Sequence, residues 1–434
     1  MKTLLMISYP FPPNATAGAV RSERFARYLQ EFGWSIDVVS IKPREDLFAD
    51  TARVANLGEN VGLHLTSTVD PWLWARNKNP NNRILRVLRS LIMELSAFPD
   101  HMLFWVPFAV RKGLEIHKRS PVDAIYTTSP PHSTHLAGLL LSKRLNIPWV
   151  ADFRDPWTLN AYRQEGFPKN TLSKLERFLE RKVYEKAAVI LANTRANRKN
   201  LLAAFPWLGE DKVQYLPNGW EEFPDQFYSK GRNEVFTIVH AGTFYPRFRP
   251  YGLFHALATW RDGKQPPAVP ELDKSIRIVL LGARDAETRK TVQNLGLEDW
   301  VEIRPWVALE EARKIMCSAD LLWATLGTGR ESATYVPSKL FEYMAAQKPI
   351  LGFFPEGDAS GLIRETRTGV VFTADDPGPV IEFLWKMKSA PANEWKGGSR
   401  IHDPNDPMAG YHIRAITGNL AGILEEISQG KSRS

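Results

Sequence analysis

The sequence holds one cysteine, Cys317, among its 434 residues, and no apolar run approaches the length of a membrane span. A single cysteine excludes an internal disulfide framework and is typical of a reducing compartment. A membrane-spanning helix needs about 20 apolar residues, so the sequence predicts no such helix. The apolar stretch after Met1 is broken at Pro10 and lacks a small-residue cleavage site, which favours a first β-strand over a signal peptide. We therefore expect a cytoplasmic protein.

Basic residues are unevenly distributed. The net charge is +8, and residues 76–119 hold nine basic and three acidic side chains, a local charge of +6. Such a segment favours phosphate-bearing partners, namely anionic lipid, nucleic acid or a diphosphate substrate. A predicted helix over 83–95 would carry Arg83, Arg86 and Arg89 opposite an apolar face. That pattern is typical of an interfacial helix, or of an ordinary docked helix with a solvated face.

The length suits two domains of about 200 residues each. Short apolar runs alternate with amphipathic helical stretches, which indicates βαβ units and parallel, doubly wound α/β sheets. A turn-rich segment from Tyr215 onward reads as the linker, so we expect domains over 1–225 and 226–412 and a C-terminal helix in 413–434. That helix is expected to pack back on the N-terminal domain. The predicted strands are 3–8, 36–41, 124–127, 149–153 and 189–192, then 236–241, 276–281, 301–304, 321–324, 349–354 and 370–372; the predicted helices include 20–32, 132–145 and 171–187.

The segment from Tyr335 to Gly352 carries the clearest local signal for chemistry. Ser338 is a suitable N-cap, and the unpaired N–H groups at a helix N-terminus form an anion site. Lys339 would add a cation there, and Glu342, one turn later, can accept hydrogen bonds from a ribose diol. From spacing alone, a capped helix with a Lys–Glu pair accounts for the same residues.

Pro337–Ala345, followed by Lys348-Pro349-Ile350, resembles the donor-binding segment of glycosyltransferase family 4. The resemblance implies a retaining enzyme of the GT-B fold, two Rossmann-like domains facing a central cleft. It implies that Lys339 and the helix terminus at Ser338 bind the donor diphosphate and that Glu342 binds the ribose. Thr334 stands where the family has a glutamate that contacts the donor sugar.

Two further loops are similar to loops of the same family, and the resemblance extends over nearly the whole chain. The loop from Ser8 to Arg21 is similar to the first loop, where a glycine, here Gly18, lets the backbone approach donor and acceptor. The loop from His240 resembles the one whose glycine and basic residue hold the donor phosphates, here Gly242 and Arg247, or Arg249 in its place. Read without the resemblance, these are a loop after a strand and a solvated basic turn.

Two carboxylates flank an arginine directly after an apolar strand, in Asp152-Phe153-Arg154-Asp155. Charges at the carboxyl end of a sheet can serve acid–base or anchoring roles. An Asp–Arg ion pair that pins the loop is the alternative. Many family members have a histidine here, near the acceptor, and this chain has Arg154 instead. We interpret Asp152, Arg154 and Asp155 as acceptor-side catalytic residues.

No metal or cofactor is predicted. His132 and His135 share a helix turn without a third ligand, and the chain has no Asp-x-Asp motif. Two cations and a helix terminus would suffice to stabilise a departing diphosphate. Tryptophans 300, 306 and 323 are expected in the core.

We expect transfer of a hexose from a nucleoside-diphosphate sugar to a hydroxyl group with retention, on a lipid-linked glycan or a polysaccharide precursor. The basic segment 76–119 would then lie on the anionic inner face of a membrane. A sugar-nucleotide epimerase and a non-catalytic nucleotide-sugar- or nucleic-acid-binding protein are the alternatives. A nucleic-acid partner is not expected, since no RNA- or DNA-binding motif is present.

Overall fold

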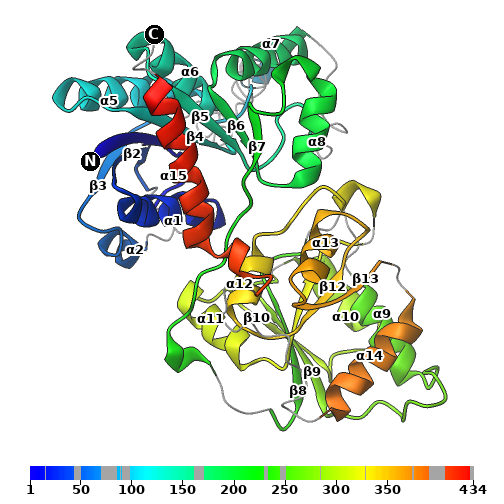
Figure 1. The fold of residues 1–434 in the computed structure, drawn as a ribbon. Helices are drawn as coiled ribbons and strands as arrows, with labels where there is room; N and C mark the ends of the chain where they lie inside the picture. The colour runs from blue at the N-terminus through cyan, green and yellow to red at the C-terminus, as the bar shows by residue number, and fades with distance from the viewer. Residues whose placement is uncertain are drawn as a thin grey trace. The chain divides into compact units, whose positions relative to one another are not determined.

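The computed structural model describes most of the chain as two α/β units (Figure 1). Unit 1 is Met1–Asn218 with Ile413–Ser434, and unit 2 is Gly219–His412. The boundary between the units lies after Asn218, whereas the linker pattern predicted it after residue 225. The described residues are 1–14, 16–43, 50–69, 86–87, 89, 98–160, 171–228, 233–244, 251–283, 285–327, 329–373, 376–390 and 406–430.

Unit 1 contains a seven-stranded parallel sheet in the order β3-β2-β1-β4-β5-β6-β7. The five inner strands agree with the predicted ones to within two residues at each end. The sequence did not reveal β3 and β7, which lie at the two edges and are short or half-buried. The strands are β1 (Lys2–Ile7), β2 (Trp34–Ile41), β3 (Val61–Thr66), β4 (Ala124–Ser129), β5 (Trp149–Phe153), β6 (Val189–Ala192) and β7 (Val213–Tyr215).

Helices cover both faces of this sheet, because alternate side chains of each strand point to opposite sides. In β1, Leu5 and Ile7 join the core under α5, α6 and α7, whereas Leu4 and Met6 join the core under α1 and α15. Helix α15 supplies Ile416 and Leu420 to the second core. The helices are α1 (Val20–Leu29), α2 (Thr51–Ala55), α5 (Val106–Arg119), α6 (Ser133–Leu145), α7 (Thr171–Lys186), α8 (Arg195–Ala204) and α15 (Ile413–Gln429).

Unit 2 contains a six-stranded parallel sheet in the order β10-β9-β8-β11-β12-β13, also with buried clusters on both faces. All six strands agree with the predicted ones to within one residue. They are β8 (Phe236–Ala241), β9 (Ile276–Leu281), β10 (Val301–Arg304), β11 (Leu321–Thr325), β12 (Ile350–Phe353) and β13 (Gly369–Phe372). The helices are α9 (Gly252–Arg261), α10 (Ala286–Asn294), α11 (Leu309–Ser318), α12 (Lys339–Ala345), α13 (Asp358–Glu365) and α14 (Pro377–Ser389).

Two doubly wound parallel units confirm the predicted fold class. The predicted helix over 83–95 lies outside the described residues except for Arg86, Val87 and Arg89. Among the described residues, no helix is both long and apolar enough to cross a membrane.

Candidate active site

In unit 2, the residues predicted to bind the donor gather at the carboxyl end of the sheet, where ligands of open α/β sheets bind. Gly242 follows β8 with a φ of +107°, a conformation that residues with a side chain rarely adopt. A Cβ atom at Gly242 would lie 3.3 Å from the ammonium nitrogen of Lys339. Gly242 therefore leaves room for Lys339, which begins α12, and the structure brings these two predicted residues together.

His240 fixes the position of the Lys339 ammonium group. Its Nδ1 lies 2.9 Å from the carbonyl oxygen of Trp323, which can only accept, so Nδ1 carries the proton and donates. Nε2 then presents a lone pair, and Lys339 Nζ donates to it over 3.1 Å. Burial, and then the charge of Lys339, holds the pKa of His240 well below its ordinary value, so this imidazole is neutral.

The lysine itself is poised between its two protonation states. Desolvation of the ammonium group lowers the pKa of Lys339 to about 7. No carboxylate of the described residues lies within ion-pairing distance of Lys339, so no fixed charge there compensates its own. An anion placed beside Nζ would supply that compensation.

Tyr343, one turn further along α12, joins the end of β8 to the middle of β11. Its hydroxyl accepts from the backbone N–H of Ala241 at 2.8 Å and donates to the carbonyl of Trp323 at 3.1 Å. Trp323 is buried, as the sequence predicted for it. Its carbonyl oxygen thus accepts hydrogen bonds from both His240 and Tyr343, which fixes β8 and β11 around Lys339.

The start of α12 differs from the sequence interpretation in one respect. Ser338 occupies the N-cap position of α12, as predicted, but it has helical backbone angles and its side chain makes no capping hydrogen bond. The N–H groups of Leu340 and Phe341 already donate to Pro337 and Ser338. Within the described part of the chain, the N–H groups of Ser338 and Lys339 donate to no acceptor. These two groups are the ones still available to an anion.

Glu342 is paired with an arginine that the sequence did not reveal. Arg313 on α11 donates from Nε to Glu342 Oε2 over 3.0 Å, and both side chains are largely shielded from solvent. The guanidinium of Arg313 also lies 4.8 Å from the ring centre of Phe223. Arg313 therefore fixes the carboxylate that the sequence assigns to the ribose. Arg247 and Arg249 lie outside the described residues, and Thr334 is half-buried in the turn before α12.

Trp306 also lies at the carboxyl end of this sheet, and the prediction that it belongs to the core was wrong. Its side chain is 48% exposed, so it is not a core residue. The backbone links this edge from strand to strand, because Gly242 donates to Leu281 and Gly282 donates to Arg304. A Cβ atom at Gly282 would lie 3.9 Å from the indole Cδ1 of Trp306. The exposed indole of Trp306 thus follows β10, two strands away from β8, at the same carboxyl end of the sheet as Lys339.

In unit 1, Asp152 lies inside the fold rather than at its surface. The side chain is buried on β5 and accepts from Arg21 twice, at 2.9 and 3.0 Å. It also accepts from Tyr126 at 2.6 Å and from Thr128 at 2.8 Å. Arg21 in turn donates to the carbonyl of Leu216 at 2.8 Å. Both oxygens of Asp152 are occupied, so the geometry favours a structural ion pair at this position.

Arg154 joins three loops at the carboxyl end of the same sheet. Its guanidinium donates to the carbonyls of Ser129 at 2.8 Å, Pro130 at 2.7 Å and Gly18 at 2.5 Å. A Cβ atom at Gly18 would lie 3.2 Å from the guanidinium, so glycine permits this approach. The structure therefore brings Gly18 and Arg154 together, with the donors of Arg154 directed at backbone.

Asp155 is the carboxylate of this loop that remains available to contact a substrate. It is half-buried just after β5, and in the described part of the chain it makes neither a hydrogen bond nor an ion pair. Burial raises the pKa of Asp155, against the opposing charge of Arg154. The residues after it are held by α7: Trp157 donates to Glu176 at 2.6 Å, and the Thr158 N–H donates to Glu180 at 3.0 Å.

His132 and His135 have packing roles. His135 is buried, its Nδ1 lies 2.7 Å from Thr127 Oγ1, and burial lowers its pKa to about 3. His132 stacks on Trp157 at 5.2 Å. Across the described residues, no group of three or more His, Cys, Asp or Glu side chains is placed to hold a metal ion. Metal independence of the reaction stays a prediction.

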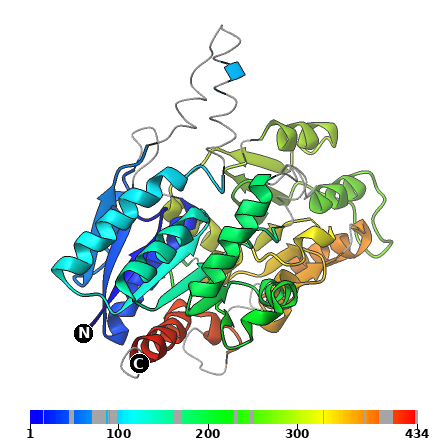
Figure 2. The same ribbon diagram turned by 90° about the horizontal axis from the view of Figure 1, so that it is seen from above.

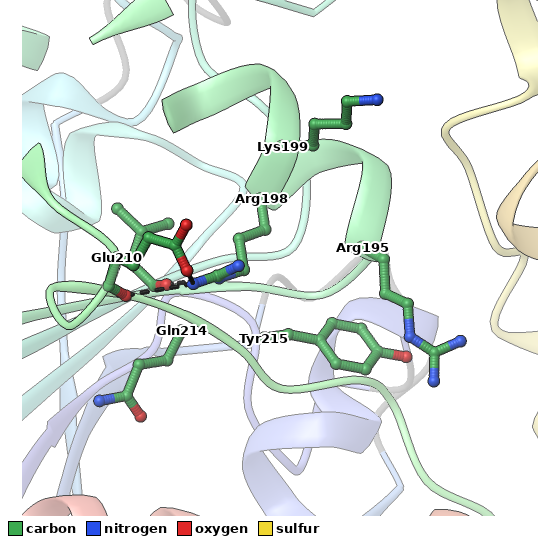
Figure 3. Close-up of a pocket in the computed structure, with 7 residues that line it drawn as sticks. Arg195, Arg198, Lys199, Glu210, Gln214 and Tyr215 are labelled. Atoms are coloured by element: carbon green, nitrogen blue, oxygen red, sulfur yellow. Dashed lines mark hydrogen bonds and ion pairs between the residues drawn. The ribbon is translucent and has the colours of Figure 1, made fainter. Parts of the chain in front are cut away.

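A pocket of about 510 Å³ lies elsewhere on unit 1, between α8 and β7 (Figure 3). Its lining includes Arg195, whose guanidinium lies 5.2 Å from the ring centre of Tyr215. Arg198, also in the lining, donates to the Val213 carbonyl at 2.7 Å. None of the predicted site residues lines this pocket.

Both halves of the chain match known protein families. Residues 16–219 match the family described as "Glycosyl transferase 4-like domain", and residues 252–387 match "Glycosyl transferases group 1". No curated protein sequence shows a significant match to this chain.

Solved structures share the fold over almost the whole chain. Sucrose-phosphate synthase from Thermosynechococcus elongatus is 13% identical, with a TM-score of 0.65 over 99% of this chain and 100% of that one. Anabaena Alr3699/HepE, in complex with UDP and glucose, is 16% identical, with a TM-score of 0.61 over 98% and 100%. TarM is 10% identical, with a TM-score of 0.64 over 98% and 99%. At these identities the similarity shows the GT-B fold alone.

Proposed function

Because the chain is a glycosyltransferase with a glycosyl transferase 4-like domain and a group 1 domain, we propose that it transfers a hexose from a nucleoside-diphosphate sugar to an acceptor hydroxyl with retention. Anabaena Alr3699/HepE is described in complex with UDP-glucose, which supports a uridine donor for this chain. The acceptor we propose is a lipid-linked glycan or a polysaccharide precursor, met at an anionic membrane surface on the cytoplasmic side.

The observation that carries the proposal is the Lys339 ammonium group, held over Gly242 by neutral His240. Lys339 lacks a carboxylate partner among the described residues, and two free backbone N–H groups lie beside it at Ser338 and its own position. This arrangement suits a diphosphate whose negative charge grows as the sugar departs. Glu342, oriented by Arg313, would accept from the ribose hydroxyls.

In the proposed reaction the bond between the anomeric carbon and the diphosphate oxygen breaks while the acceptor oxygen bonds to the same face of the sugar. The acceptor proton passes to the departing diphosphate, so no covalent enzyme intermediate is required. Lys339 stabilises the developing charge, and Arg247 would add a second cation. In unit 1, Asp155 would accept a hydrogen bond from the acceptor hydroxyl and orient it, while Arg154, Gly18 and the buried Asp152 keep its loop in place.

The test begins with thermal shifts against a panel of nucleotides and nucleotide sugars, since a bound donor raises the melting temperature by mass action. Release of free nucleoside diphosphate is then measured with and without a lipid extract. We expect release that depends on the extract, and loss of that release in Lys339→Ala. Lys290→Ala, on α10 of the same unit, is the control and should keep it. Conversion of the sugar without any acceptor would instead identify an epimerase, and the transferase proposal would then be wrong.

A further inference from the structure

Three helices form one layer over a face of the unit 1 sheet. Helix α6 packs between α5 and α7, and the three lie side by side in both views (Figures 1 and 2). Their inner sides supply the core that contains Trp105, Leu141 and Val183. Their outer sides, which we call the α5–α7 face, point away from the sheet.

The α5–α7 face is strongly basic because part of its acidic complement points inward. Glu176 and Glu180 of α7 are buried, where they hold the loop that follows β5. Only Glu115 and Glu185 remain as outward carboxylates on the three helices. Against them stand eleven basic residues: Arg111, Lys112, Lys118, Arg119, Lys143, Arg144, Lys174, Arg177, Arg181, Lys182 and Lys186.

Exposed aromatic and aliphatic side chains lie among these cations. Phe178 of α7 is 54% exposed, and Trp207, in the short 3₁₀ helix Pro206–Leu208, is 47% exposed. Lys182 Nζ lies 5.5 Å from the ring centre of Phe178, and the Arg181 guanidinium lies 5.6 Å from that of Trp207. Each ring is thus held next to a cation. Phe104, Phe108, Leu140 and Leu175 are further exposed apolar side chains among the described residues of this face.

The opposite layer of unit 1 does not share this character. In α1, Arg21 and Arg24 are buried and Arg27 is half-buried. In α15, the one basic residue, Arg414, is outnumbered by Glu425 and Glu426. This layer has one exposed ring, Phe32 at 41%, but the outward positive charge is concentrated on the α5–α7 face.

We propose that the α5–α7 face binds the surface of an anionic lipid bilayer. Aromatic rings favour the interface between headgroups and acyl chains, and lysine and arginine beside them attract anionic headgroups. Part of the basic segment predicted from the sequence, Arg111–Arg119, lies on this face; α7 and Trp207 extend it to residues that the sequence did not suggest. The inference rests on the proposed function only in that a lipid-linked acceptor requires the enzyme to reach a membrane.

Vesicle co-sedimentation tests the face directly, without donor or acceptor. We expect the chain to bind vesicles that contain phosphatidylserine, to bind phosphatidylcholine vesicles weakly, and to lose binding as salt rises, because the Debye length shortens. Lys174→Glu with Arg177→Glu should weaken binding at least about 30-fold, since each basic residue near an anionic surface strengthens binding roughly fivefold. Neither side chain has an ion-pair partner in the described residues, so the fold should persist.

The matched control reverses the same charges on a helix of unit 2, in Arg289→Glu with Lys290→Glu on α10. This pair should bind vesicles like the unaltered chain. Phe178→Ser with Trp207→Ser should also weaken binding, through the apolar contribution alone. Equal binding to neutral vesicles, no binding to either kind, or an equal loss in the α10 control would overturn the proposal, as would binding to duplex DNA in place of vesicles.

Nucleotide thermal shifts on the same preparations separate this inference from the proposed function. A chain that binds nucleotide but no vesicle refutes the membrane face and leaves the transferase intact. A chain that binds vesicles but no nucleotide refutes the donor site and leaves the membrane face intact.

Discussion

Donor binding should weaken as pH rises through neutrality, because Lys339 must be charged to hold a diphosphate. Its pKa in the free protein is lowered to about 7, so about half of the molecules carry the charge at that pH. Beside a bound diphosphate the charged form is favoured, and the pKa rises toward its ordinary value. Donor affinity is therefore highest at pH values below the pKa of Lys339 in the free protein. It falls as the pH rises from that pKa to the pKa of Lys339 in the complex.

The size of the effect follows from the pKa of about 7. One missing proton costs affinity about tenfold per pH unit above that pKa, so going from about pH 6.5 to about pH 8.5 should weaken binding about 25-fold. The nucleotide sugar is the right ligand, since its diphosphate diester does not titrate in this range. Calorimetry in two buffers of different ionisation enthalpy should show uptake of about half a proton per donor bound near pH 7.

Two variants check that Lys339 is the titrating group. Lys339→Arg should abolish the slope, because arginine stays charged at every pH of the titration. His240→Phe removes the acceptor of the Lys339 hydrogen bond but preserves a ring against Phe244, so the fall in affinity should begin at lower pH. The reasoning is refuted if affinity is flat across this range in the unaltered chain, or if Lys339→Arg keeps the full slope.

Four other substitutions probe the remaining residues. Glu342→Ala should weaken nucleotide binding about tenfold or more in calorimetry, because each ribose hydroxyl loses a charged acceptor worth about 1.5–3 kcal/mol; unchanged affinity would remove Glu342 from the site. Trp306→Ala should reduce affinity for nucleotides by about 1–3 kcal/mol if its exposed indole stacks on the base, with little effect on pyrophosphate binding. Asp155→Asn should lower transfer to the acceptor while donor affinity and the unfolding midpoint stay close to those of the unaltered chain. Asp152→Asn should instead lower the free energy of unfolding by about 3–5 kcal/mol, because it leaves Arg21 charged and unpaired in the interior; a folded but inactive Asp152→Asn would return that residue to the acceptor side.

The fold was predictable because its central strands are continuous apolar runs between helices, as parallel strands buried on both faces must be. The edge strands gave no such signal: β3 includes His64 and Gly62, five of its six residues are half-buried, and β7 has only three residues. The sequence could therefore indicate two doubly wound units without giving the width of the first sheet.

Site residues were predictable where they share one short sequence segment, and residues that reach the site from distant segments were not. Lys339 and Glu342 share one helix turn, but their partners, His240 and Arg313, lie 99 and 29 residues away and follow no motif. Asp152 and Asp155 look equivalent in the sequence. Their difference arises because one is on a buried strand beside Arg21, whereas the other lies beyond the end of that strand.

The place of α15 in unit 1 has a consequence for synthesis on the ribosome. Helix α15 carries Ile413, Ile416, Leu420 and Leu424 into the core that also contains strand β1, and Lys2 bonds Glu425 at 2.6 Å. The 194 residues between Asn218 and Ile413 are translated in between, which takes roughly 10–40 s at about 5–20 residues per second. During that interval one face of the sheet in the nascent unit 1 is incompletely covered. A stop codon ahead of α15 would leave that same face exposed to solvent.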